Sequence, residues 1–195
     1  IHIKPGTEVD IVLVGDNTLT GATGCAGIFV EAGRDTNGDF SEAASAKVTF
    51  KGDGSLTANG GDALHGNVGG GAGIGGNGFG ETACVTGGNF GVIVIESGNI
   101  TANGGDDDEA TKPGAGSDYG AGAGIGGGGV LGNNMWTYCG HIEIEGGTVV
   151  ANGGNGYDGG AGIGSGSTGS SYATLSHITT VISGGHIKAT GGKCS

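Results

Sequence analysis

The chain has 195 residues, of which 52 are glycine, and 19 acidic against 7 basic side chains give a formal net charge of −12. An acidic surface repels phosphate backbones and anionic lipid, so the charge argues against nucleic-acid binding and against a membrane-surface role. No apolar run approaches the ~20 residues that span a bilayer.

The ends and the cysteines give expectations about origin and compartment. The chain begins at Ile1 without a signal-like stretch, so we expect a processed or excised segment of a larger protein. Its four cysteines, an even number without metal-ligand spacing, favour two disulfides in an oxidising compartment. These features predict a secreted or cell-surface protein.

A glycine-punctuated phrase recurs five times along the chain. It starts as Asn17-Thr-Leu-Thr and returns as Gly54-Ser-Leu-Thr-Ala-Asn-Gly-Gly, Gly98-Asn-Ile-Thr-Ala-Asn-Gly-Gly, Gly147-Thr-Val-Val-Ala-Asn-Gly-Gly and Gly185-His-Ile-Lys-Ala-Thr-Gly-Gly. A second phrase, Ala-Gly-Ile, follows the first four, at Ala26, Ala72, Ala123 and Ala161. Self-similarity at a period of about 37–49 residues predicts a stack of like units.

The residues before each phrase alternate between apolar and polar, which is typical of half-buried strands. Alignment on the phrase gives two columns. The first contains Val12, Val48, Ile93, Ile142 and Thr180, and the second contains Val14, Phe50, Ile95, Ile144 and Ile182; Val48 and Phe50 align only with one extra residue in the turn. Two further inward columns are Leu19, Leu56, Ile100, Val149 and Ile187, and Ile28, Ile74, Ile125 and Ile163. Each unit thus offers three short strands between Gly-Gly corners.

Three short strands per turn predict an all-β, single-stranded parallel β-helix of about five coils, spaced about 4.8 Å apart. Residues 1–195 form one domain, with an N-terminal capping coil at 1–46, central coils at 47–176 and a C-terminal coil at 177–195. We expect Asn59, Asn103 and Asn152 to stack at a corner, with their amides bonded to neighbouring coils.

Two stretches resemble a known class of repeat. Gly70-Gly-Ala-Gly-Ile-Gly-Gly and Gly98-Asn-Ile-Thr-Ala-Asn-Gly-Gly are similar to glycine-rich repeats in large secreted and cell-wall proteins of gut Firmicutes. The resemblance covers roughly residues 7–192 and implies a right-handed β-helix beside carbohydrate-binding or adhesion modules. It implies recognition of a glycan or host surface glycoprotein, but the matching positions carry no binding residue. We expect a monomeric module of a larger protein.

Two acidic segments are candidate calcium sites, because hard cations prefer oxygen ligands. The first holds Asp35, Asn37 and Asp39 at alternating positions, with Glu42 as a further candidate ligand, although Phe40 stands where an EF-hand requires glycine. The second is the run Asp106, Asp107, Asp108 and Glu109. Solvated polar loops are the alternative for both segments.

Aromatic residues in the loops are candidate glycan platforms, because sugar rings stack their C–H faces on aromatic rings. The candidates are Trp136, Tyr138, Tyr119 and Tyr157. The alternative for Trp136 is that it folds back over a glycine-rich face and covers it, whereas Phe29, Phe50 and Phe90 belong in or beside the core.

These observations favour a non-catalytic binding or adhesion module. A structural stalk that displays other domains is the alternative, although a stalk would need no unequal, aromatic-bearing loops. A polysaccharide-degrading enzyme is disfavoured, because His65 precedes Asp107 and Asp108, the reverse of the polygalacturonase order, and the sole arginine is Arg34. An ice-binding threonine array would start at Thr20, Thr57 and Thr101 but is broken by Val150 and Lys188.

For the cysteines we predict the sequential pairs Cys25–Cys84 and Cys139–Cys194. The alternative pair, Cys84–Cys139, would leave Cys25 and Cys194 four coils apart, beyond the ~7 Å limit for a disulfide.

Overall fold

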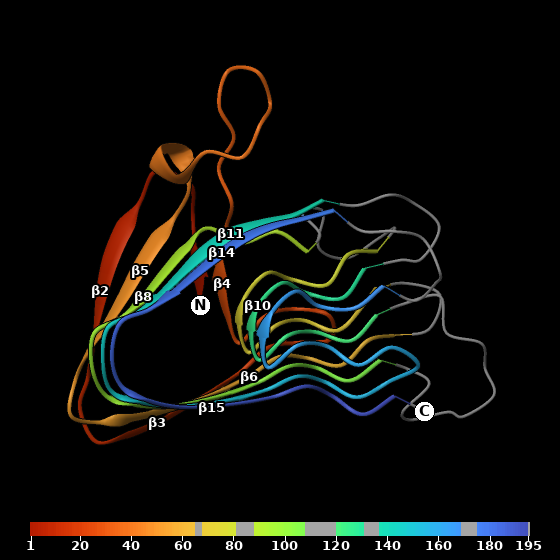
Figure 1. The fold of residues 1–195 in the computed structure, drawn as a ribbon. Helices are drawn as coiled ribbons and strands as arrows, with labels where there is room; N and C mark the ends of the chain where they lie inside the picture. Colours follow the sequence, from red (N-terminus) through yellow and green to blue (C-terminus); the bar gives the residue numbers. More distant parts are fainter. Residues whose placement is uncertain (65–67, 81–87, 108–119, 131–136, 169–174, 195) are drawn as a thin grey trace.

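The computed structural model describes residues 1–64, 68–80, 88–107, 120–130, 137–168 and 175–194. These residues form a parallel β-helix, in which the chain passes through three five-stranded sheets in the same order in each of five coils (Figure 1). The expected fold is therefore confirmed. The one helical element of the described residues is a 3-10 turn, η1 (Glu42–Ala44), and none of their helices is long and apolar enough to cross a membrane.

The strands fall into three sheets, which we name A, B and C. Sheet A contains β1 (His2–Ile3), β4 (Ile28–Val30), β7 (Ile74–Gly75), β10 (Ile125–Gly126) and β13 (Ile163–Gly164). Sheet B contains β2 (Glu8–Leu13), β5 (Lys47–Gly52), β8 (Val92–Ile95), β11 (Thr137–Ile144) and β14 (Leu175–Ile182). Sheet C contains β3 (Asp16–Thr20), β6 (Ser55–Asn59), β9 (Asn99–Asn103), β12 (Thr148–Asn152) and β15 (His186–Thr190).

Aliphatic columns fill the space between the sheets, as the repeat predicts. In sheet B the Val48, Ile93, Ile142 column and the Phe50, Ile95, Ile144 column are fully buried and in register. The isoleucines of the Ala-Gly-Ile phrases also stack on one another; Ile28, Ile74 and Ile125 are fully buried, and Ile163 of the last coil is half-buried. The core is thus one continuous cluster along the solenoid axis.

The first coil lies in a different register from the predicted one. Val9 and Ile11, not Val12 and Val14, occupy the Ile93 and Ile95 columns, and Val12 and Val14 are 63% and 75% exposed. The prediction was wrong by three residues, and an odd shift exchanges the two faces of a strand.

Sheet C of the first coil is shifted as well. Asn17 pairs with Leu56, and Leu19 pairs with Ala58, two residues from the predicted alignment. Leu19 still points toward the core, because an even shift keeps the face. Thr18, not Thr20, therefore begins the column of Thr57 and Thr101.

Two polar ladders join the coils at the end of sheet C. The Asn103 amide donates to Asn59 Oδ1, and the Asn152 amide donates to Asn103 Oδ1, each at 2.8 Å, which confirms the predicted asparagine stack. The second ladder is formed by the residue three positions after each stacked asparagine. The side chain of this residue accepts a hydrogen bond from a backbone N–H of the following coil. Asp62 accepts from Asp106, Asp106 from Asn155, and Asn155 from Lys193, at 3.0, 2.7 and 3.0 Å.

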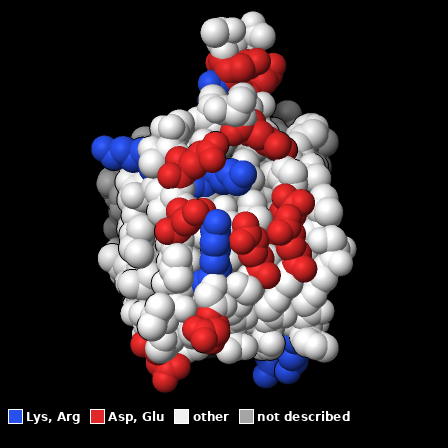
Figure 2. Space-filling view, turned by 90° about the vertical axis from the view of Figure 1, so that its left-hand side faces the viewer, with Lys and Arg blue, Asp and Glu red and all other residues white. Residues whose placement is uncertain are grey.

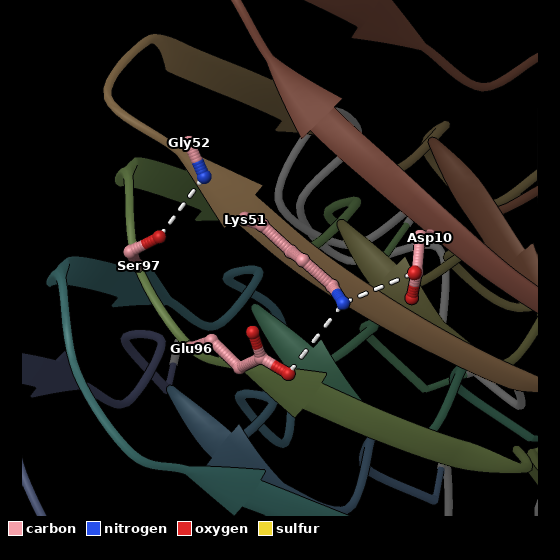
Figure 3. A network of polar contacts seen from close by, with 5 residues as sticks. All are labelled: Asp10, Lys51, Gly52, Glu96 and Ser97. Atoms are coloured by element: carbon pink, nitrogen blue, oxygen red, sulfur yellow. Dashed lines mark hydrogen bonds and ion pairs between the residues drawn. The ribbon is translucent and has the colours of Figure 1, made fainter.

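The outer surface of sheet B carries ion pairs between coils. Lys51 Nζ lies 3.0 Å from Asp10 and 3.8 Å from Glu96, and the Gly52 N–H donates to Ser97 Oγ at 2.9 Å (Figure 3). The hydrogen bond to Asp10 raises the pKa of Lys51. Acidic side chains surround basic ones on the face in Figure 2, so part of the charge there is balanced locally.

The register makes a prediction about stability. Replacement Ile95→Ala should lower the free energy of unfolding by about 2–5 kcal/mol, because it leaves a cavity in the middle of the core. Replacement Val14→Ala should change it by less than about 0.5 kcal/mol, because Val14 is exposed. Denaturant unfolding of both variants tests this, and equal losses would contradict the register of the first coil.

Candidate functional site

A hairpin inserted between β4 and β5 is the most elaborate described loop. Arg34 and Phe40 form an antiparallel bridge, and the turn between them is closed by Asp35. Asp35 Oδ1 accepts the N–H groups of Asn37 and Asp39 at 2.8 and 3.0 Å. These hydrogen bonds lower the pKa of Asp35 below its ordinary value, and the bond from Asn37 has the largest effect. Gly38 completes the turn with φ of +86°, a conformation that side chains disfavour.

The hairpin is fastened to the solenoid by buried and exposed contacts. At its base the Gly33 N–H donates to Ser45 Oγ at 2.8 Å, and Ser45 Oγ in turn donates to the Ser41 carbonyl at 2.7 Å. Farther along, Glu42 Oε1 lies 2.8 Å from Nδ1 of His141 on β11. The insertion from the second coil is therefore tied to the fourth coil.

A cavity of about 440 Å³ lies between this hairpin and the first residues of β11 and β14, and we name it the hairpin cavity. Its described lining consists of Arg34, Asp39, Phe40, Cys139 and His177. Cys139 and His177 are direct partners on the neighbouring strands. The volume falls within the ~300–1,000 Å³ of small-molecule sites.

The walls of the hairpin cavity combine an aromatic ring with groups of both charges. Phe40 is half-buried, whereas Arg34 and Asp39 are exposed. Arg34 donates to the Gly38 carbonyl at 2.7 Å through one nitrogen, which fixes the guanidinium and leaves further N–H groups for a ligand. The cavity thus offers an apolar face, a fork of donors and a carboxylate acceptor.

The thiol of Cys139 is not activated. Burial raises its pKa, and the opposing effect of the Arg34 charge is smaller. Its backbone N–H donates to Asn89 Oδ1 at 3.0 Å, which holds the start of β11 on the chain before β8. A thiol with a raised pKa is protonated at neutral pH and is a poor nucleophile.

A second cavity, of about 340 Å³, lies at the first coil. Its lining includes His2, Phe29, Cys25 and Asn77, and much of the remainder is backbone and small residues. The rings of His2 and Phe29 stack 4.6 Å apart, and His2 Nε2 lies 2.7 Å from Glu31. Its described lining offers neither an arginine nor a carboxylate, so the hairpin cavity is the better candidate.

The candidate calcium ligands of the hairpin make other contacts. Asp35 caps its own turn, Glu42 contacts His141, and Asp39 lines the hairpin cavity. The Asn37 amide lies 3.4 Å from Asp35 Oδ2. Within the described residues, no three His, Cys, Asp or Glu side chains are placed to share a metal ion. Calcium binding here stays a prediction without support from the geometry.

The second acidic segment contributes to the solenoid. Asp106 Oδ1 accepts from the Asn155 backbone and side chain at 2.7 and 3.1 Å. Asp107 is fully buried, and its Oδ2 accepts the Tyr157 N–H at 2.7 Å. Asp108 and Glu109 lie outside the described residues.

The predicted aromatic platforms are not gathered at one described place. Tyr157 is 55% exposed on the connection after β12, apart from the lining of the hairpin cavity. Trp136 and Tyr119 lie outside the described residues, as does the side chain of Tyr138, whose backbone pairs with Ser176. However, Cys139 follows Tyr138 directly, so the loop predicted to bind glycans adjoins the hairpin cavity.

Sequence reasoning did not predict that Arg34, Phe40 and His177 line one cavity, and it considered Cys139 only for a disulfide. The sequence feature that could have indicated this cavity is the long insertion at 31–46, because functional residues often lie on such loops.

One predicted disulfide is not formed. Cys139 and Cys194 are free thiols. Cys139 lies on sheet B opposite His177, whereas Cys194 follows sheet C and bridges to Gly156. The prediction compared the order of the cysteines along the chain and overlooked that these two leave different sides of a coil. Cys84 lies outside the described residues, so its pairing with Cys25 stays a prediction.

Comparison with known proteins gives no relative. No family model matches the chain, and neither the curated proteins nor the solved structures yield a match. The resemblance to repeats of secreted and cell-wall proteins therefore stays a prediction.

The Asp35 turn makes a prediction about pH. A carboxylate whose pKa is lowered by folding stabilises the folded form above its unfolded pKa, and this contribution is lost as the pH falls through the lowered pKa. Hairpin order should thus be constant from neutral pH to about pH 5 and decline below the ordinary aspartate value of 3.8. Amide exchange at Asn37 and Asp39 measures it, and Asp35→Ala should remove the dependence.

The two free thiols make a second prediction. In the native protein, iodoacetamide should alkylate exposed Cys194 at least about tenfold faster than Cys139, whose rate should rise with pH. Peptide mapping after timed quenching measures both rates, with guanidinium-unfolded protein as the control in which they converge. A linked Cys139–Cys194 peptide under non-reducing conditions would instead reinstate the disulfide.

Proposed function

We propose that this protein is a non-catalytic extracellular binding module that recognises a glycan, and that the hairpin cavity is the binding site. The observation that carries the proposal is the combination of Phe40, Arg34 and Asp39 around one cavity of about 440 Å³. A sugar ring has apolar C–H faces that pack on an aromatic ring, and hydroxyl groups that pair with a guanidinium and a carboxylate.

The construction of the site supports binding. Its walls come from the hairpin of the second coil and from β11 and β14 of the fourth and fifth coils, which the continuous sheet B holds in fixed register. A loop held against a rigid scaffold loses little conformational entropy on binding. This arrangement favours recognition over a uniform stalk, which remains the alternative function.

The chemistry of the cavity gives less support to catalysis. Hydrolysis of a glycosidic bond normally uses two carboxyl groups, and the described lining supplies one, Asp39. Nucleophilic catalysis by Cys139 would require a thiolate, which burial of the thiol disfavours. We therefore propose binding without turnover.

The proposed extracellular location rests on the even number of cysteines and on the resemblance described above, and the partner class rests on the resemblance. The proposed partner is a glycan or host surface glycoprotein. Calcium, proposed from the two acidic segments and not from the resemblance, is the candidate cofactor. The free thiols of Cys139 and Cys194 lend this location no support.

A glycan-array screen of the protein, with and without calcium, tests the function. Calorimetry with the best ligand should then show that Phe40→Ala weakens binding about 30-fold, the effect of losing an interface hot spot of ~2 kcal/mol. Arg34→Ala should weaken it similarly, because hydrogen bonds to the hydroxyl groups are lost.

The matched control is Tyr157→Ala, which removes an exposed aromatic ring outside the hairpin cavity and should leave affinity unchanged. Equal losses for Tyr157→Ala and Phe40→Ala would place the site elsewhere. A Trp136→Ala/Tyr138→Ala variant examines the adjoining loop, and a protein that binds no glycan on the array would favour the stalk.

A further inference from the structure

Asparagine precedes glycine at six places in the chain: Asn37-Gly38, Asn59-Gly60, Asn77-Gly78, Asn103-Gly104, Asn152-Gly153 and Asn155-Gly156. This pair is chemically labile, because the glycine nitrogen can attack the side-chain amide of the asparagine before it. A glycine has no Cβ to shield its nitrogen, and its backbone reaches conformations that other residues disfavour. Each pair is therefore a candidate modification site, and its surroundings in the fold decide whether it reacts.

Five of the six pairs lie in the solenoid, where the glycine nitrogen is both bonded and enclosed. Their glycine N–H groups share one arrangement, since each donates at 2.7–3.0 Å to a carbonyl of a neighbouring coil: Gly60, Gly78, Gly104, Gly153 and Gly156. A Cβ added to any of them would collide with a packed neighbour, a backbone oxygen in most cases and the Asp107 carboxylate at Gly156. A side chain thus has no room to swing toward these nitrogens.

The side chains of the five solenoid asparagines are also held by hydrogen bonds. Asn77 Oδ1 accepts the Ala26 N–H at 2.8 Å, and Asn155 Oδ1 accepts the Lys193 N–H at 3.0 Å. The remaining three form the amide ladder at the end of sheet C: Asn59, Asn103 and Asn152. Each of these amides would have to leave a neighbouring coil before it could reach its own glycine.

The pair Asn37-Gly38 differs from the others because it lies in the turn of the hairpin, which stands clear of the sheets (orange loop at the top of Figure 1). Asn37 is exposed, whereas the other five asparagines are buried or half-buried. A Cβ added to Gly38 would meet nothing within 4 Å, so the space around this peptide is open. The Gly38 N–H donates at 3.0 Å to the Asp35 carbonyl of the same turn, and this bond can open without separating any coils.

We propose that Asn37 is the site at which this protein deamidates spontaneously, while the asparagines of the solenoid are preserved. The Gly38 nitrogen forms a bond to Cγ of Asn37, and the proton of Gly38 leaves with the side-chain amide as ammonia. Water then opens the cyclic succinimide at either of its carbonyl groups. One opening gives aspartate, and the other gives isoaspartate, in which the main chain runs through Cγ. Both reacting groups belong to one chain, so the attack is intramolecular and water is the only other reactant.

The conversion alters the hairpin, because Asn37 is part of its turn. The Asn37 amide nitrogen lies 3.4 Å from Asp35 Oδ2, so the new carboxylate faces the carboxylate of Asp35. Like charges this close disfavour the ionised Asp35 that caps the N–H groups of Asn37 and Asp39. The hairpin supplies part of the described lining of the hairpin cavity. A ligand there would lose a fixed wall, a consequence that rests on the proposed function, whereas the modification itself does not.

Ageing of the folded full chain in mildly alkaline buffer tests the proposal. Samples are digested at acidic pH, where the reaction is slow, and mass spectrometry quantifies aspartate and isoaspartate at each asparagine. Asn37 should deamidate at least about 30-fold faster than Asn59, Asn103 or Asn152, because opening a hairpin turn costs less than separating coils. The control is the chain unfolded in guanidinium, in which the rates should converge because every pair has the same local chemistry.

The effect on the hairpin is measured with two variants. Asn37→Asp carries the charge of the product, and its Asp39 amide should exchange at least about threefold faster than in the wild type, because the turn opens more often. Asn37→Gln is the matched control, since it keeps a neutral amide on a side chain whose ring closure is much slower. It should release no ammonia at this position and should exchange as the wild type does. Circular dichroism verifies that both variants are folded.

Two results with the wild-type protein would overturn the proposal. The first is equal deamidation of Asn37 and of the ladder asparagines in the folded chain, which would show that the coils give no protection. The second is an Asn37 that reacts in the unfolded chain and stays intact in the folded one, which would show that the Asp35 turn protects as well as the coils do. Unchanged exchange in Asn37→Asp would refute the effect on the hairpin.

Discussion

The fold depends on successive coils lying in direct backbone contact at their corners. A Cβ added to Gly124 would lie 2.7 Å from the Asn152 nitrogen and from the Gly162 oxygen, so nothing larger than glycine fits between these coils. Gly126 adds a conformational requirement, because its φ of +134° disfavours side chains. Close contact at the corners brings the strands to hydrogen-bonding distance, and like residues then stack on like. The aliphatic columns and the amide ladders follow from this spacing.

The sheets could be predicted well from the sequence because a recurring motif, Ala-Asn-Gly-Gly, identifies the corners. Where Ala-Asn-Gly-Gly is present, the alignment of Ile95 with Ile144 and of Asn103 with Asn152 agrees with the structure. The first unit lacks this corner. Its strand also has apolar residues on both faces, Val9 and Ile11 inward and Val12 outward, so hydrophobic alternation alone did not fix the register.

The candidate site was less predictable for a physical reason. Arg34 and His177 are more than 140 residues apart in the sequence, and only the stacking of the second coil near the fifth brings them to one cavity. The position of His177 depends on the register of β14, and in this strand a threonine, Thr180, occupies a column that is apolar in the other coils. The acidic runs, conspicuous in the sequence, instead supply turn caps and ladder acceptors, as Asp35 and Asp106 show.

The hairpin also gives the number of repeats a meaning of its own. It leaves the second coil and forms one cavity with strands of the fourth and fifth coils, and the fifth lies three rungs away, or roughly 14 Å at the parallel-strand spacing. Duplicating or deleting a coil is a mild event for a solenoid, since each unit contacts only its neighbours. For this chain, however, such an event between the third and fifth coils would move His177 by one full rung relative to Phe40. The hairpin therefore fixes the number of coils between its base and β14. A change in that number would disrupt the cavity even though the solenoid could still fold.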